Sequence, residues 1–166
     1  MIEGPRHTER LQRLARAFIR DRRAAAAVDL ALLALPFMLL LLATMQLGMY
    51  YMTQVALDAA TVKTAESLRA VFGTGTTPVT PSGSALKTSI VSGSGTGITA
   101  TGLIVEIQPL ANLNSGAVTI TDGLTNYGTA WTPLVLRANY TFQTFVPGFA
   151  TNWTVNSSAI VRRQGQ

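Results

Sequence analysis

The chain has 166 residues, a net charge of +5 and no cysteine. This length leaves room for one membrane anchor and one small domain, and the lack of cysteine excludes disulfides and thiol chemistry. The positive charge is concentrated at the start: residues 1–23 hold seven Arg and three acids, while the remainder holds six basic and five acidic residues. Past residue 23 no Lys/Arg patch with interleaved aromatic residues occurs, so the sequence argues against nucleic-acid binding.

Residues 1–24 form a basic leader. Its apolar positions recur with helical spacing at Leu11, Leu14, Ala15, Phe18 and Ile19, which predicts an amphipathic helix suited to an anionic inner leaflet. The leader is either a permanent positively charged flank or a removable segment. A secretory signal peptide fits poorly, because its apolar core spans only about 7–15 residues, and a mitochondrial transit peptide would lack acids.

Residues 24–51 contain no Lys or Arg and a single acid, Asp29. As a helix this stretch would be about 40 Å long, which exceeds the roughly 30 Å hydrocarbon core of a bilayer. We therefore predict a transmembrane helix over residues 25–52. Because basic residues next to a span stay in the cytoplasm, the leader is expected inside and the later residues outside.

Two residues of this span are not needed by a simple anchor. Asp29 either lies at headgroup depth, where an acid near the start of a helix interacts favourably with the helix dipole, or lies deeper and pairs with a positively charged partner. Pro36 removes one backbone hydrogen bond and is expected to kink or loosen the helix.

Residues 53–72 read as an amphipathic continuation of the helix, with one face formed by Val55, Ala59, Val62, Ala65, Leu68 and Phe72. Residues 73–101 are rich in Gly, Ser and Thr, which predicts a loop with one short turn of helix or strand at residues 85–91. The run at residues 93–97 lacks the Lys-Ser/Thr of a phosphate loop, so this segment is interpreted as a variable surface loop open to adhesive contacts.

Residues 102–166 are predicted to form a small antiparallel sheet, because four runs alternate with period two: 103–107, 118–120, 134–142 and 153–161. About sixty-five residues make a thin core, so the outer half of the helix should supply the second layer. The expected class is α+β. Glu106 alternates with apolar neighbours and is expected to face solvent.

Several of these features form one longer pattern. An Arg-rich leader precedes Ala25-Ala26-Ala27-Val28-Asp29-Leu30-Ala31, Pro36 interrupts the apolar stretch, Gly48 lies near its end, and Gln54-Val-Ala-Leu-Asp58-Ala-Ala60 follows. Over about residues 20–70 this pattern resembles the TadE-like family, pilin-related proteins of bacterial tight-adherence (Flp-type) pili. The final residues more loosely resemble the last two strands of that family. The resemblance implies a pilin-like fold, in which a long N-terminal transmembrane helix extends into the sheet domain.

The resemblance also implies a prepilin-like precursor in the bacterial inner membrane. A prepilin peptidase would cut between Ala24 and Ala25, although Ala24 stands where Gly is usual and Asp29 where Glu is usual. Asp29, then the fifth mature residue, would pair with the Ala25 amine of an adjacent subunit. The implied partners are membrane lipid before assembly, an inner-membrane assembly platform, the major Flp-type pilin and other minor pilins.

Three functions are weighed on this basis. The first is a minor pilin or pseudopilin that primes or caps the filament and supports surface adhesion. The alternative is a single-pass, membrane-anchored periplasmic or surface binding module, which has no need of Asp29. An enzyme is disfavoured, because the only His lies in the leader and the outer acids are well spread; we predict no catalytic, cofactor-binding or metal residues.

Overall fold

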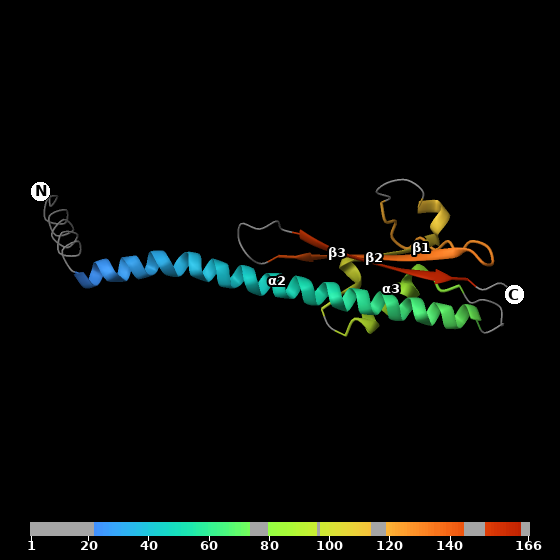
Figure 1. Cartoon of the computed structure of the whole chain (residues 1–166), viewed down its shortest axis with the longest axis horizontal. Coiled ribbons are helices and arrows are strands. Elements are labelled where there is room, and N and C mark those ends of the chain that lie inside the picture. Colours follow the sequence, from blue (N-terminus) through green and yellow to red (C-terminus); the bar gives the residue numbers. More distant parts are fainter. Residues whose placement is uncertain (1–21, 74–79, 96, 114–118, 145–151, 164–166) are drawn as a thin grey trace, which may run out of the picture. The chain divides into compact units, whose positions relative to one another are not determined.

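The computed structural model describes residues 22–73, 80–95, 97–113, 119–144 and 152–163, with side chains from residue 26 onward. Most of the leader lies outside these residues. The chain divides into two compact units, Met1–Met45 and Gln46–Gln166. The fold is α+β and pilin-like, as predicted: a long N-terminal helix is followed by a three-stranded antiparallel sheet (Figure 1).

The long helix, α2, comprises Arg22–Gly73, 52 residues. Its first part is rich in Ala, Leu and Met, which have high helix propensity. Pro36 lies inside α2, so the helix continues through it, and the expected kink stays a prediction. The Thr44 hydroxyl donates to the Leu40 carbonyl at 2.7 Å, so this polar group is satisfied within the helix.

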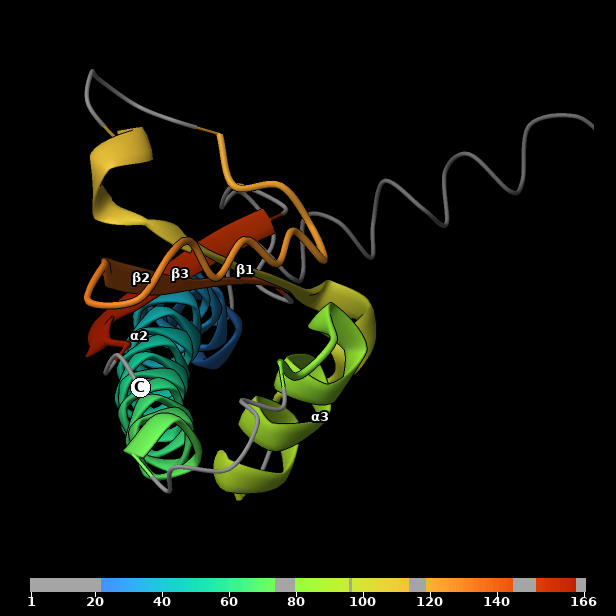
Figure 2. The ribbon, with the colours of Figure 1, turned by 90° about the vertical axis from the view of Figure 1, so that its right-hand side faces the viewer.

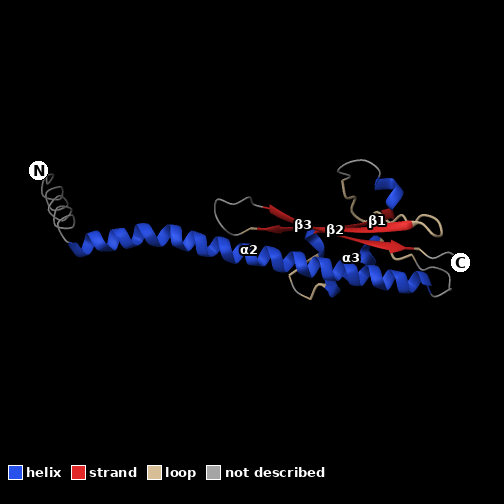
Figure 3. Ribbon diagram, in the orientation of Figure 1, coloured by secondary structure: helices blue, strands red, loops and turns tan. Residues whose placement is uncertain are grey.

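The sheet has the order β1-β2-β3, with β1 at Leu103–Pro109, β2 at Pro133–Gln143 and β3 at Asn152–Arg162 (Figure 3). Leu103 pairs with Tyr140 across the first ladder, and Phe142 pairs with Trp153 across the second. The alternating residues predicted to share a face do so: Leu134, Leu136, Ala138 and Tyr140 are buried, as are Val155 and Val161.

One predicted strand is not found among the described residues. Residues 119 and 120 are not in a strand, and residue 118 lies outside the described residues. The chain that follows instead runs along the free edge of β1: the amide of Gly123 donates to Val105, and that of Ile107 donates to Leu124. Because an unpaired edge invites pairing with other chains, these bonds protect β1.

The core of the second unit lies between the sheet and two helices. Leu57, Leu68 and Phe72 of α2 pack in one cluster with residues of all three strands. Figure 2 shows α2 and a second helix, α3 (Gly83–Gly93), beneath one face of the sheet. The helix therefore supplies the second layer, as the thin predicted sheet domain requires.

The face that α2 turns to this core differs in part from the prediction. Val55, Ala59 and Val62 are exposed, whereas Ala60, Thr61 and Thr64 are buried. Both buried hydroxyl groups have partners: that of Thr61 donates to the Leu57 carbonyl at 2.7 Å, and that of Thr64 lies 3.2 Å from the Ser89 hydroxyl of α3.

The segment predicted as a loop contains an eleven-residue helix, α3, at Gly83–Gly93. Its amino end is capped by Ser82, whose hydroxyl accepts from the Ala85 amide at 3.3 Å. Leu86 and Ile90, one turn apart, are buried in the core. Burial of these two side chains accounts for a full helix where composition indicates a loop.

Side chains of α2 cap the other edge of the sheet. Gln54 donates to the Asn156 carbonyl at 2.8 Å, and Arg69 donates to the Ile160 carbonyl at 2.6 Å. Both carbonyls belong to β3, the edge strand. Sequence periodicity gave no signal for these contacts, because each joins residues more than ninety positions apart.

Candidate membrane-spanning segment and its charged residues

The helical part of the first unit exposes almost all of its large apolar side chains. Between residues 30 and 45 the exposed Leu, Phe and Met side chains are 42% to 69% accessible (Leu30, Leu32, Leu33, Leu35, Phe37, Met38, Leu39, Leu40, Leu41 and Met45). A contiguous apolar surface of this extent is unusual on a protein surrounded by water and marks a membrane or protein contact.

Length and composition agree with the first of these. Among the helices of the described residues, α2 is the one that is long and apolar enough to cross a membrane. It has the properties expected of a single-pass anchor, since about 20 apolar residues of helix span the hydrocarbon core.

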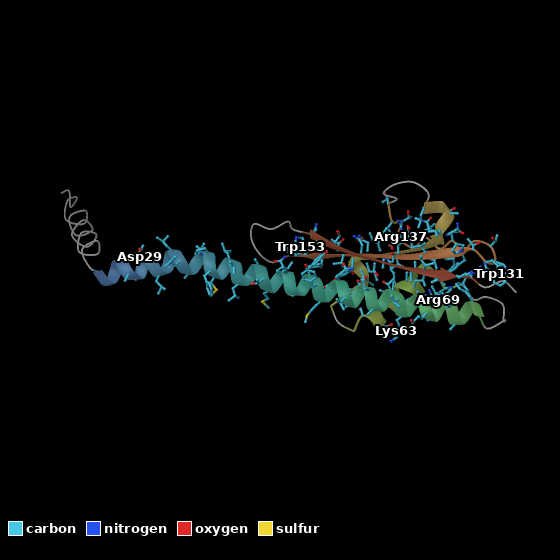
Figure 4. The ribbon with its side chains drawn as sticks, in the orientation of Figure 1. Asp29, Lys63, Arg69, Trp131, Arg137 and Trp153 are labelled. Atoms are coloured by element: carbon cyan, nitrogen blue, oxygen red, sulfur yellow. The ribbon has the colours of Figure 1, made fainter. Side chains whose placement is uncertain are left out.

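The residues predicted to guide processing and assembly lie near the start of α2. Ala24 and Ala25 belong to its backbone, and the Asp29 side chain is exposed (Figure 4). Ala25 and Asp29 are four positions apart, so they lie about 6 Å apart along the axis and on one side of the helix. Cleavage between Ala24 and Ala25, and pairing of Asp29 with an amine, stay predictions.

Comparison with known proteins bears on the same stretch. Residues 24–65 match the family model of TadE-like proteins. The chain carries a TadE-like segment. The predicted resemblance is thereby confirmed over these residues, and it suggests a protein associated with tight-adherence pili. No curated protein and no solved structure gives a significant match.

The TadE-like segment includes both the part of α2 whose apolar side chains are exposed and the start of the part whose apolar side chains are buried. It begins before Asp29, includes the exposed apolar stretch and Pro36, and ends at buried Ala65. The region matched by the family is therefore the helix, and the sheet lies outside the match.

Glu106 corrects an expectation, because its side chain is buried and not solvent-facing. It forms an ion pair with Arg137, whose Nε donates to Oε1 at 2.6 Å. Gln108 donates to the same oxygen at 2.9 Å, and the Thr121 amide donates to Oε2 at 2.6 Å. A buried carboxylate needs such partners, and removing the oppositely charged partner of a buried ion pair costs about 3–5 kcal/mol. We interpret this network as structural.

Two other titratable groups hold loops of the second unit together. The Lys87 ammonium lies 2.7 Å from an Asp122 oxygen, and this hydrogen bond lowers the pKa of Asp122. The Tyr127 hydroxyl donates to the Pro81 carbonyl at 2.6 Å, and burial raises the pKa of Tyr127 to about 12.

The chemistry of the described residues is correspondingly limited. Within them, no group of three or more His, Asp or Glu side chains is placed to hold a metal ion. The sheet face opposite the helices has a shallow polar depression of about 420 Å³, lined by Ile120, Arg137, Asn139, Asn156, Ser157 and Ser158.

Proposed function

We propose that the chain is a minor pilin or pseudopilin of a tight-adherence (Flp-type) pilus system. It primes or caps the filament and supports surface adhesion. Its role is mechanical and not catalytic. The observation that carries this proposal is the coincidence of the TadE-like match with a helix whose apolar side chains are exposed.

An exposed apolar helix has two favourable environments. Each buried methylene group is worth about 0.8 kcal/mol, so the exposed stretch gains much free energy by leaving water. In the bacterial inner membrane, lipid covers it while the leader stays in the cytoplasm and the sheet domain faces the periplasm. In the filament, the helices of the major Flp-type pilin and other minor pilins replace that lipid.

Asp29 selects the partner helix in this exchange. A charged side chain within the hydrocarbon costs about 2.5–3.5 kcal/mol on insertion scales, and an opposite charge offsets this cost. After a prepilin peptidase cuts between Ala24 and Ala25, the new amine of an adjacent subunit supplies that charge. The pair therefore fixes the register of neighbouring subunits while an inner-membrane platform extracts them.

The outer part of α2 offers a further surface for neighbouring helices. Val55 and Val62 are exposed on the face away from the sheet, and a shallow groove there is also lined by Asp58, Ala59, Lys63 and Glu66. An apolar stripe flanked by both signs of charge suits packing against a similar helix. This surface supports assembly through the whole length of α2.

The first experiment follows processing. We expect the protein, expressed with the matching peptidase, to lose 24 residues and begin at Ala25, as read by N-terminal sequencing. Ala24→Gly should be cut faster, because it restores the usual residue, and Ala24→Arg should not be cut. A wild-type protein that keeps Met1 in that host would contradict the proposal.

The second experiment separates the proposal from a membrane-anchored binding module. We expect Asp29→Ala to lower the amount of the protein in sheared pilus fractions at least tenfold, and Asp29→Glu to retain it. Asp122→Ala, which changes an exposed acid of the sheet domain outside α2, is the control. Unchanged incorporation of Asp29→Ala would favour the binding module, which has no need of this acid.

A further inference from the structure

Four aromatic rings meet at one end of the second unit. The Tyr50 ring of α2 lies 5.4 Å from that of Trp153 and 6.2 Å from that of Phe142, measured between centroids. Trp153 and Phe142 are 6.3 Å apart, and Tyr51 contacts Tyr50 at 5.7 Å. We call these four residues the aromatic cluster. It joins the helix to both strands of the β2–β3 hairpin.

The cluster lies at a defined end of the sheet. Phe142 and Trp153 face each other at the last residues of β2 and the first of β3. Trp131 comes two residues before the start of β2, so it lies at the opposite end of this strand, whose Pro133 and Phe142 are about 30 Å apart at 3.3 Å per strand residue. Figure 4 shows the two tryptophans at the two ends of the sheet.

The place of Tyr50 along the chain is equally defined. Residues 30–49 follow Asp29 and precede Tyr50, and twenty residues of helix are about 30 Å long, the thickness of the hydrocarbon core. Tyr50 and Tyr51 therefore follow the span at the depth where headgroups begin. Gln54, one turn later, bonds β3 at Asn156, so the hairpin is held to the helix near this level.

We propose that the aromatic cluster seats the sheet domain on the membrane surface, with phospholipid at the headgroup–acyl boundary as its partner. Tyr and Trp are enriched at this depth, because their rings are apolar and their O–H and N–H groups stay hydrated. Tyr51 is 60% exposed and Met52 77% exposed, while Tyr50, Phe142 and Trp153 are half-buried. The cluster thus places one end of the sheet domain at the depth of the lipid headgroups before assembly.

This inference rests on the membrane anchor of the proposed function, and the chain allows a direct test because it has only two Trp. Trp131→Phe leaves Trp153 as the single reporter, and Trp153→Phe leaves Trp131. The full-length variants are reconstituted into vesicles of phosphatidylcholine and phosphatidylglycerol. Some of the lipid carries bromine near the glycerol end of the acyl chain or near the methyl end.

We expect Trp153 fluorescence to fall by at least one third with the shallow bromines and less with the deep ones, and Trp131 fluorescence to be unchanged. Flotation of the vesicles is measured in parallel. Vesicle-bound protein in which neither Trp is quenched, or both equally, would overturn the inference and leave the anchor intact. Protein that does not float with the vesicles would overturn both.

Discussion

The two halves of α2 differ in the exposure of their apolar side chains. In the first unit, Leu30, Leu33 and Leu40 are more than 60% exposed, whereas in the second, Leu57 and Leu68 are at most 2% exposed. The sheet and α3 cover the second half, whereas the large apolar side chains of the first half are exposed. The comparison teaches that hydrophobicity alone does not tell a core helix from a helix that needs an external partner.

The charged residues distinguish the half of α2 that packs in a core from the half that needs an external partner. Residues 24–51 contain one charged side chain, whereas the four residues Asp58, Lys63, Glu66 and Arg69 follow within the second half. These four are exposed, on the side of the helix that water reaches. A helix with one polar face is built for one protein layer, and a helix without such a face is built for lipid or for a ring of other helices.

The largest expected effect is on stability. Leu57→Ala removes a fully buried side chain and leaves a cavity, so we expect it to destabilise the sheet domain by about 2–5 kcal/mol. Leu40→Ala is the matched change in the exposed half and should shift the unfolding free energy by less than about 0.5 kcal/mol. Urea unfolding in mild detergent, followed by near-UV circular dichroism, measures both.

Equal losses of stability in Leu57→Ala and Leu40→Ala would break the comparison, because both halves would then be packed into one folded domain. A larger loss of stability in Leu40→Ala than in Leu57→Ala would show that the first half, and not the second, packs in a folded core.

The smallest expected effect concerns the pH dependence of the second unit. Because the pKa of Asp122 is lowered in the folded state, its pair with Lys87 stabilises the fold above the ordinary pKa of 3.8. This contribution is lost as the pH falls through the lowered pKa. The Asp122 side chain is 51% exposed, so we expect only about 0.2–1 kcal/mol.

Asp122→Asn should remove this contribution at pH 7 and flatten the stability profile between about pH 5 and pH 2. Thermal unfolding of the two proteins across this range checks the difference. A variant with the wild-type profile would show that the ion pair adds nothing. Membrane association should be the same in both, because Asp122 lies in the sheet domain.

The sequence was sufficient for the features that local periodicity controls. The apolar length of the helix and the period-two alternation of residues 134–142 and 153–161 depend on neighbours in the chain. Both the α+β class and the two longer strands were predicted on this basis.

Three features that depend on distant contacts were not predicted. Glu106 has the alternation of an exposed strand residue, but Thr121 and Arg137 cover it from 15 and 31 positions away. The buried face of α2 includes Ala60, Thr61 and Thr64, whose small size suits close packing. The more hydrophobic Val55 and Val62 were predicted to lie on this face, but both are exposed. Helix α3 consists mostly of small and polar residues, and its Leu86 and Ile90 are buried in the core.

Among the residues proposed to be functional, those with a local sequence signal were predicted and those defined by distant contacts were not. Asp29 stands out because a single acid interrupts an apolar run, and that signal is local. The contact of Tyr50 with Phe142 and Trp153 joins residues about a hundred positions apart, and no pattern in the sequence announces it.

Chemical labelling of two substituted cysteines tests the central claim most directly, because the chain has no cysteine of its own. Leu40→Cys and Val62→Cys both replace exposed side chains, so the protein itself shields neither position. With the full-length protein in vesicles whose sheet domain faces outward, a membrane-impermeant maleimide should label Val62→Cys readily and leave Leu40→Cys unmodified. Equal labelling of the two positions would show that the exposed apolar half of α2 does not lie in the membrane.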